Sequence, residues 1–242
     1  MNNATTTKQA LITGASSGIG KATALAFAKA GINLALVSRK SENLEAVAAA
    51  AREVGVKAEA YPLDLAKIEG VQSSISAIAT QFGPIDILVN SAGMGYTGSL
   101  TETSLTDWQS VLDLNLTSVW QCILGVLPGM RDQKSGIIIN VSSIAGSQVF
   151  PNWGLYCVSK FGLMALSKTL AAEERASGIR VTAICPGSVN TPMWDTDTVQ
   201  SDFDRTAMLT PEIVAQSILH AVQLPANAVI EEITLMSNAG VL

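Results

Sequence analysis

The sequence predicts an α/β fold in which one doubly wound parallel sheet is covered by helices on both faces. Short apolar runs of strand length alternate with longer runs of helix length along the whole chain. Strands of this apolar kind, separated by helices, are typical of parallel sheets buried on both faces. We find no linker, repeat or low-complexity segment, so we expect residues 1–242 to form a single domain.

The expected elements follow in order. Strands are predicted where short apolar runs occur, at residues 8–13, 33–38, 57–65, 86–90, 137–142, 180–186 and 232–236. Helices are predicted at 21–30, which is rich in alanine, and at 41–54, 68–82, 105–131, 154–177 and 210–223. The helix 105–131 is expected to end near Pro128 and Gly129. The polar stretch 190–210 is expected to form a mobile substrate lid, because it is rich in aspartate and threonine.

Composition excludes several classes of protein. Hydrophobic residues make up 48% of the chain and charged residues 14%, which allows a large core. No apolar run reaches the ~18 residues of a membrane span, and the first eight residues lack an apolar signal region, so we expect no export signal. A net charge of −5 without a basic run argues against nucleic acid.

Cysteine and histidine usage limits the chemistry further. Cys122, Cys157 and Cys185 are an odd, dispersed set without metal-ligand spacing. This pattern predicts a reduced, cytoplasmic protein with no metal site. His220 is the only histidine and lies in an amphipathic helix, where we expect a structural role. A histidine-based catalytic triad or a histidine-rich zinc site is therefore not expected.

A glycine-rich turn joins the first strand to the first helix. It reads Thr13-Gly14-Ala15-Ser16-Ser17-Gly18-Ile19-Gly20, with the spacing G-x-x-x-G-x-G. Glycines let the backbone turn tightly and approach a diphosphate, while the helix N-terminus supplies N–H groups and partial positive charge. Such a turn alone is a weak signal, but between the first strand and the first helix of a parallel α/β pattern it predicts a dinucleotide site.

The end of the second strand reads Val37-Ser38-Arg39-Lys40 and carries no carboxylate. NAD sites usually place an acid here to bind the ribose 2′-hydroxyl. Ser38 can instead hydrogen-bond a 2′-phosphate, and Arg39 can pair with it and stack on adenine. We therefore predict NADP(H) as the cofactor. The alternative is a solvated basic turn that starts a helix with Ser41 as its N-cap.

Tyr156 and Lys160 are four residues apart at the start of the helix 154–177, so they lie on one face of it. We expect the ammonium to stabilise the tyrosinate and lower a phenol pKa that is normally ~10. That would make Tyr156 a proton donor near neutral pH. Ser142 and Ser143 precede this pair at the end of a strand. The alternative is an exposed aromatic ring and a solvated lysine.

Further positions fit a cofactor cleft. Asp64 can accept from the adenine amino group, or it can cap a turn. The small residues of Asn90-Ser91-Ala92-Gly93 would let a ribose lie against the sheet edge. Asn115 is a poor helix-interior residue, so it indicates a local kink or a bound water. The backbone of 186–191 can contact a nicotinamide carboxamide.

Together these motifs resemble the short-chain dehydrogenase/reductase family over nearly the whole chain. The matching residues are Thr13-Gly14, Gly18-Ile19-Gly20, Asp64, Asn90 to Gly93, Asn115, Ser143, Tyr156, Lys160 and Pro186-Gly187. The resemblance implies a single Rossmann-type domain with a seven-stranded parallel sheet and an NADP-dependent oxidoreductase of the carbonyl reductase type. The implied cofactor contacts are Gly14, Ser16, Ser17, Gly18, Ile19, Gly20, Ser38, Arg39, Asp64, Leu65, Asn90, Ala92, Gly93, Tyr156, Lys160, Pro186, Gly187, Val189 and Thr191.

The resemblance also implies roles for four residues. Tyr156 would be the general acid in reduction and the base in oxidation, while Lys160 would lower its pKa, bind the nicotinamide ribose and start a proton relay. Ser143, thirteen positions before the tyrosine, would hydrogen-bond the substrate carbonyl, and Asn115 would hold a relay water. Two features depart from the family pattern. Ser91 replaces the usual Asn or Ala, and the ending ITLMSNAGVL lacks the Asp-Gly-Gly that is common in the family, which disfavours a role in fatty-acid synthesis.

The substrate pocket is predicted to be mainly apolar and aromatic. Its candidate residues are Met94, Gly95, Tyr96, Ser143, Gln148, Phe150, Trp153, Met193 and Trp194. A neutral, partly apolar ketone or aldehyde would suit them, although each of the apolar and aromatic ones can equally serve to pack loops together. Arg205 is the one arginine expected to be able to reach a substrate carboxylate.

The sequence also leaves two other functions open and predicts an oligomer. A 3-oxoacyl-(acyl-carrier-protein) reductase would need basic residues at the pocket mouth, where only Arg131 and Lys134 are candidates. A non-catalytic NADP(H)-sensing binding protein would typically have lost the tyrosine or the lysine. The two long helices carry apolar residues that a monomer would overexpose, which predicts a homotetramer or dimer; these residues are Trp120, Cys122, Leu124, Phe161 and Met164.

Overall fold

A computed structural model of the chain describes residues 7–240 and contains one seven-stranded sheet, in which every neighbouring pair of strands is parallel. The strand order is β3-β2-β1-β4-β5-β6-β7. The strands are β1 (Gln9–Thr13), β2 (Asn33–Ser38), β3 (Ala58–Pro62), β4 (Ile87–Asn90), β5 (Gly136–Val141), β6 (Ile179–Pro186) and β7 (Glu232–Leu235). The predicted fold class is confirmed, and the predicted strand ends lie within three residues of these bounds.

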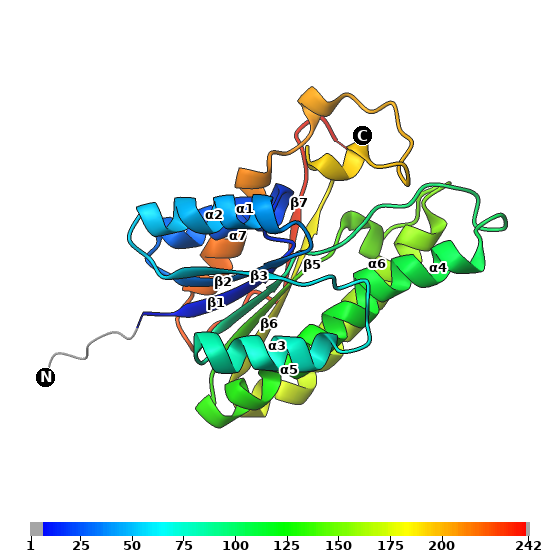
Figure 1. Ribbon diagram of the computed structural model, residues 1–242. Helices are drawn as coiled ribbons and strands as arrows, with labels where there is room; N and C mark the ends of the chain where they lie inside the picture. Colours follow the sequence, from blue (N-terminus) through cyan, green and yellow to red (C-terminus); the bar gives the residue numbers. More distant parts are fainter. Residues whose placement is uncertain (1–6, 241–242) are drawn as a thin grey trace, which may run out of the picture.

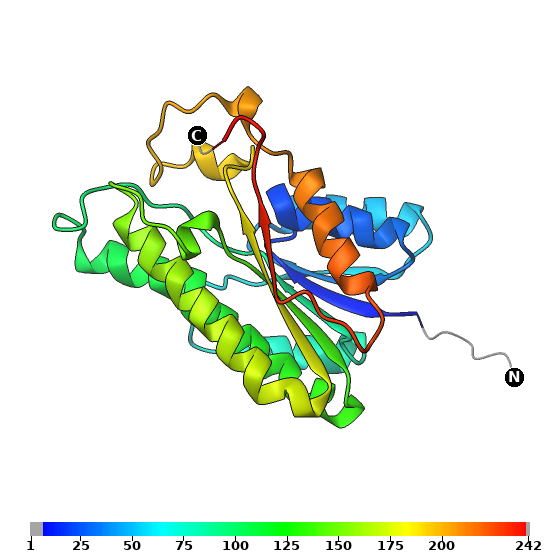
Figure 2. The same ribbon diagram turned by 180° about the vertical axis from the view of Figure 1, so that it is seen from behind.

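Helices cover both faces of the sheet (Figures 1 and 2). One face carries α1 (Gly18–Lys29), α2 (Ser41–Glu53) and α7 (Pro211–Gln223), and the other carries α3 (Val71–Phe82), α5 (Ser118–Gln133) and α6 (Gly154–Glu174). Side chains of a strand point alternately to the two faces. Ile12 accordingly packs in the core that contains Phe27 of α1, whereas Leu11 packs in the core that contains Ile75 of α3.

The segment predicted as one helix over 105–131 consists of three parts. They are α4 (Leu105–Leu112), a π-helical turn (Asp113–Thr117) and α5, which continues to Gln133. The expected end near Pro128 and Gly129 is therefore wrong. Both residues lie on the exposed side of α5, where water can satisfy the carbonyl that loses its N–H partner. The irregularity predicted at Asn115 is confirmed, because this buried residue lies within the π-helical turn.

Contrary to the expectation from apolar runs, Leu105–Gln133 has the length and mean hydropathy of a membrane span. Half of its most apolar window is buried inside the fold. Residues such as Val119, Ile123 and Val126 pack in the same core as α3 and the sheet. Burial of this kind is typical of a helix in the core of a folded domain. Such a helix can be as long and as apolar as one that spans a membrane.

The apolar residues predicted to be overexposed divide into three groups, one of which is Leu124 alone, a half-buried residue. Cys122 and Met164 are buried within the chain itself, so that part of the prediction is wrong. Trp120 is 48% exposed and Phe161 is 41% exposed, and Val158, which the sequence did not single out, is 40% exposed. Three exposed apolar side chains therefore remain on α5 and α6, fewer than the sequence indicated.

The order of the strands fixes where a ligand can bind. The chain runs outward from β1 in both directions, through β2 on one side and β4 on the other, which opens a crevice at the carboxyl ends of these strands. The segment 190–210 lies over this edge (Figures 1 and 2). Arg131 and Lys134 lie at the opposite edge, just before β5 begins at Gly136. They are thus not at the pocket mouth, where the acyl-carrier alternative required them.

Candidate active site

A cavity of about 470 Å³ opens at the carboxyl edge of the sheet. Its walls come from the glycine loop, the turn after β2, the segment after β4, residues 141–145, the start of α6 and the stretch 186–196. Among the lining residues that the structure describes, three are charged, namely Arg39, Lys40 and Lys160. All three are cations, so the cavity suits an anionic ligand even though the chain carries a net charge of −5.

The glycine loop is packed so closely that side chains cannot replace its glycines. A Cβ on Gly14, whose φ is +66°, would lie 2.8 Å from the backbone nitrogen of Ala92, and a Cβ on Gly20 would lie 2.4 Å from the Gly14 oxygen. Thr13 tightens the same junction, because its Oγ1 accepts from the N–H of Ser91 at 3.1 Å and of Ala92 at 3.2 Å. The loop is thus pressed against the end of β4 with its backbone facing the cavity.

The N-terminus of α1 retains free donors. Ser17 is its N-cap but makes no side-chain capping bond, and the first turn contains no acidic residue. The N–H groups of that turn therefore lack the acceptor that a capping side chain usually supplies. With the glycine cradle beside it, this end of α1 fits a diphosphate.

At the other end of the cavity, Ser16 and Ser38 bring their Oγ atoms within 2.7 Å of each other. Arg39 lies 4.0 Å from Asp64, and Asp64 also accepts from the N–H of Ala66 at 3.2 Å, as a turn aspartate does.

Asn43 of α2 also lines the cavity, and the sequence analysis did not predict it. Nothing in the sequence showed that this turn of α2 faces inward.

Tyr156 and Lys160 lie on one face of the first turns of α6, as predicted, and both are buried. Lys160 donates from Nζ to the carbonyl of Val141, at the end of β5, at 3.0 Å. Its Nζ lies 5.7 Å from the centre of the Tyr156 ring. Ser142 and Ser143 both line the cavity. Ser143 caps a 3₁₀ turn by accepting from the N–H of Ala145 at 3.1 Å, and Ser142 is almost fully buried.

The predicted effect of Lys160 on the phenol is wrong in this structure. Burial raises the pKa of Tyr156 to about 12, and a hydrogen bond with Ser143 offsets only part of that rise. Burial also lowers the pKa of Lys160 to about 8. The ammonium is hydrogen-bonded to the Val141 carbonyl rather than to the phenol oxygen, and burial dominates the pKa of both groups.

Asn115 joins the segment after β4 to α6. Its Oδ1 accepts from the N–H of Met94 at 2.8 Å, and its Nδ2 donates to the Met94 carbonyl at 2.9 Å and to Ser159 Oγ at 3.1 Å. Ser159 in turn donates to the carbonyl of Tyr156 at 2.7 Å. The amide of Asn115 is thus occupied by the protein, and the role of holding a relay water stays a prediction.

Asn90 and Asn140 form a buried pair of side-chain amides that the sequence analysis did not predict. Asn90 donates to Asn140 Oδ1 at 2.9 Å, and Asn140 donates to Ser167 Oγ at 2.9 Å. Asn90 Oδ1 has no partner among the residues that the structure describes. Asn140 interrupts the apolar run Ile137 to Val141, and this break was the available signal for a buried polar network.

Most predicted cofactor residues line the cavity, but three do not. Gly20 is packed beneath the glycine loop, the Asn90 side chain points into the sheet–helix interior, and Asp64 lies outside the lining. The residues that line it are Gly14, Ser16, Ser17, Gly18, Ile19, Ser38, Arg39, Leu65, Ala92, Gly93, Tyr156, Lys160, Pro186, Gly187, Val189 and Thr191.

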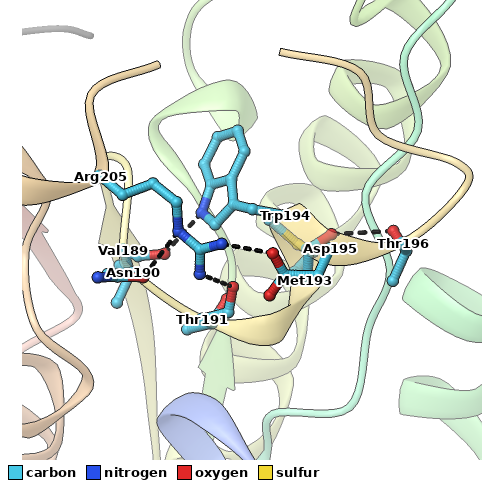
Figure 3. Close-up of polar contacts among 8 residues, drawn as sticks. All are labelled: Val189, Asn190, Thr191, Met193, Trp194, Asp195, Thr196 and Arg205. Atoms are coloured by element: carbon cyan, nitrogen blue, oxygen red, sulfur yellow. Dashed lines mark hydrogen bonds and ion pairs between the residues drawn. The ribbon is translucent and has the colours of Figure 1, made fainter. Parts of the chain in front are cut away.

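Some of the predicted substrate residues line the cavity and others do not. Those that line the cavity are Met94, Ser143, Phe150, Trp153, Met193 and Trp194. Gln148 is exposed and lies outside the lining, as do Gly95 and Tyr96. Arg205 lies outside the lining as well, and its guanidinium is bonded to Asp195, Asn190 and Thr191 (Figure 3).

Aromatic rings form a continuous wall from Tyr156 outward. Trp153 makes edge-on contacts with Tyr156, with ring centres 5.6 Å apart, and with Trp194 at 5.8 Å. Trp194 contacts Phe203 at 5.6 Å, and Phe203 is a lining residue that the sequence did not indicate. The cavity therefore has a cationic end at Arg39 and Lys40 and an aromatic end around Tyr156.

The stretch predicted as a lid is anchored in this structure. Thr97 donates its N–H to the Thr198 carbonyl at 2.8 Å and accepts from the N–H of Gln200 at 2.8 Å. Thr198 Oγ1 donates to the Gly95 carbonyl at 2.8 Å. These bonds tie 198–200 to the segment after β4, and the mobility of the stretch stays a prediction.

Comparison with known proteins identifies related sequences and structures. Residues 8–202 match the family described as short chain dehydrogenase. The 3-oxoacyl-(acyl-carrier-protein) reductase of Staphylococcus epidermidis is 38% identical over 187 residues, 77% of each chain. The sepiapterin reductase of Chlorobaculum tepidum is 33% identical over 237 residues, covering 95% of this chain and 96% of that protein. Glycine betaine reductase of Emericella nidulans is 33% identical over 234 residues, which are 94% of this chain but 18% of that protein.

Solved structures share the whole fold. An alcohol dehydrogenase from the archaeon Thermococcus sibiricus, complexed with 5-hydroxy-NADP, superimposes with a TM-score of 0.87 at 30% sequence identity. The match covers 96% of this chain and 97% of that chain. The similarity therefore extends over both ends of the cavity.

We expect Lys160→Met to stabilise the protein at pH 7. The lysine pKa is near 10.5 when unfolded and about 8 when folded. Below pH 8 the buried ammonium therefore costs about 3 kcal/mol, and between pH 8 and 10.5 the unfolded chain binds more protons, so wild-type stability rises with pH. Urea unfolding across this pH range should give the variant a higher free energy of unfolding than the wild type at pH 7. The difference should shrink above pH 8. Lys168→Met, at an exposed site on α6, should follow the wild-type profile, and a difference independent of pH would contradict the assignment.

Proposed function

Because the chain belongs to the short-chain dehydrogenase/reductase family, we propose that it is an NADP(H)-dependent oxidoreductase that reduces a ketone or aldehyde to an alcohol. The observation that carries this proposal is one cavity in which Tyr156, Ser143 and Lys160 meet the glycine loop. Each group has a use in carbonyl reduction, and the cavity joins them to a site with the shape and charge for a dinucleotide.

In the proposed mechanism, bound NADPH supplies the hydride that reaches the carbonyl carbon. Tyr156 donates its proton to the developing alkoxide oxygen, and Ser143 donates a hydrogen bond to the same oxygen. Tyr156 is protonated at neutral pH, as an acid in reduction must be, and the burial that raises its pKa to about 12 makes the free phenol a weaker proton donor than an exposed tyrosine. Lys160 would bind the nicotinamide ribose and return a proton to Tyr156, and Asn115 would hold the water of that relay.

The preference for NADP(H) is supported by the cationic end of the cavity. Arg39 and Lys40 line it, and no acidic residue lies among the described lining residues to bind a 2′-hydroxyl or repel a phosphate. The Arg39 side chain is 64% exposed and only loosely paired with Asp64, so it is free to turn toward a 2′-phosphate. The Thermococcus relative, whose complex contains 5-hydroxy-NADP, agrees with this choice.

We propose a neutral, partly apolar carbonyl compound as the substrate. The aromatic end of the cavity offers Trp153, Trp194 and Phe203, and its one charged residue is Lys160. The segment 190–210 would act as the lid over this end. A 3-oxoacyl-(acyl-carrier-protein) reductase is the second candidate, favoured by the 38% identical relative but not by the position of Arg131 and Lys134.

We also propose that the protein works as a homotetramer or dimer in the cytoplasm. The exposed apolar side chains of Trp120, Val158 and Phe161 support association through α5 and α6. Its cysteines, all free and buried, fit a reducing compartment, which cell fractionation can check.

Replacing Tyr156 with Phe tests the chemistry. The variant should lose about 10²- to 10⁴-fold in turnover, because the proton donor is gone, while NADPH affinity stays the same. NADPH consumption should be followed with a panel of ketones, aldehydes, keto acids and acyl thioesters. Tyr96→Phe, outside the cavity lining, is the matched control. Unchanged turnover in Tyr156→Phe would refute the assigned acid, and a wild type that binds NADPH without any turnover would instead indicate a sensor.

Arg39→Ala tests the cofactor preference. Loss of a charge-assisted contact with the 2′-phosphate should weaken NADPH binding about 10- to 100-fold and leave NADH binding nearly unchanged. Dissociation constants can be measured by fluorescence of the reduced cofactors. Arg52→Ala, at the far end of α2, should change neither constant. Equal losses for both cofactors in Arg39→Ala would argue against a 2′-phosphate site.

Phe161→Asp tests the association surface. A charge at this exposed apolar position of α6 should dissociate the oligomer, and light scattering should then give a mass near the 25.2 kDa of one chain. Val54→Asp, an exposed apolar position at the end of α2, should leave the assembly intact. A wild type that is already monomeric would remove the proposal.

A further inference from the structure

Arg205 donates to three acceptors at once (Figure 3). Its Nε donates to Asn190 Oδ1 at 2.9 Å, its Nη1 to Asp195 Oδ1 at 2.5 Å and its Nη2 to the Thr191 carbonyl at 3.0 Å. The guanidinium thus joins a 3₁₀ turn at Arg205–Ala207 to another at Pro192–Asp195. One planar cation fixes both ends of the short segment 190–195.

The segment 190–195 is part of the wall, whereas Arg205 is not. Thr191, Met193 and Trp194 line the cavity, whereas Arg205 is bonded to this segment without being a lining residue. The indole of Trp194 is fixed by a further bond, from Nε1 to the Val189 carbonyl at 2.7 Å. Arg205 therefore influences a ligand through the wall rather than by contact with it.

This wall meets both ends of the cavity. A Cβ on Gly18 would lie 3.2 Å from Thr191 Cγ2, so Thr191 stands directly across from the glycine loop. Trp194 packs edge-on against Trp153, and Trp153 against Tyr156. A shift of 190–195 would consequently change the space for the diphosphate and the shape of the aromatic end together.

We propose that Arg205 is a positioning residue that holds this wall ready for cofactor and substrate before either binds; the inference rests on the proposed function. Arginine suits the role because its rigid fork can serve three acceptors, whereas a lysine offers one point charge on a flexible stem. If the segment 190–195 is ordered before the ligand arrives, binding does not have to offset the entropy lost in ordering it. The residue should therefore affect KM and cofactor affinity, and leave kcat nearly unchanged.

The test compares Arg205→Met, Arg205→Lys and Asp195→Asn with the wild type. We expect Arg205→Met to raise the KM for a ketone and the NADPH dissociation constant about three- to tenfold, with kcat within about twofold. Arg205→Lys should recover less than half of that loss, and Asp195→Asn should fall between wild type and Arg205→Met. Chymotrypsin, which cleaves after aromatic residues, should cut after Trp194 or Phe203 faster in Arg205→Met. The matched control is Arg175→Met, which removes an exposed ion pair with Glu231 far from the cavity and should change none of these values.

Two results would overturn the inference. One is an Arg205→Met variant with wild-type KM, NADPH affinity and cleavage rate. The other is a fall in kcat with KM unchanged, which would mean that Arg205 acts on the chemical step. If the wild type reduces no carbonyl compound, the proposed function fails, and NADPH affinity and the cleavage pattern still decide the role of Arg205.

Discussion

A buried ammonium fastens the first turns of α6 to the end of β5. The bond from Lys160 to the Val141 carbonyl places the whole N-terminal part of α6 against the carboxyl edge of the sheet. It also sets the position of Tyr156, one turn earlier on the same helix face. A charge this deeply buried is unfavourable unless it is hydrogen-bonded, and burial lowers the pKa of Lys160 to about 8.

The same burial decides the protonation of the phenol. Removal from water destabilises a tyrosinate more than a lysine bonded elsewhere can stabilise it, so the two pKa values shift toward the neutral forms of both groups. Tyr156 is consequently a neutral donor with Ser143 beside it. Anything that draws the ammonium toward the phenol oxygen would reverse part of that shift, because the attraction between unit charges rises steeply at short range in a low-dielectric site.

The sequence was sufficient for those features that depend on local pattern. Apolar runs located all seven strands, and the spacing of four placed Tyr156 and Lys160 on one helix face. Asn115, a poor helix former, correctly indicated an irregular turn. Other features depend on packing that no local pattern encodes. The pKa shifts follow from burial, the inward direction of Asn90 follows from its pairing with Asn140, and the distance of Arg131 and Lys134 from the pocket follows from which sheet edge they occupy.

Around this cavity, hydrogen bonds from side chains satisfy the backbone groups of the loops. In the sheet, hydrogen bonds between paired strands do the same. The loops that follow parallel strands have no ladder of their own, yet their backbone groups still need partners. Thr13 holds the backbone after β4, Asn115 holds Met94 on both sides, and Arg205 holds Thr191. Thr13, Asn115 and Arg205 each hold the backbone through the arrangement of their hydrogen-bonding atoms, and not through side-chain size or charge alone. Substitutions that keep the volume, such as Thr13→Val or Asn115→Leu, would therefore disturb the site more than larger changes on the outer helices.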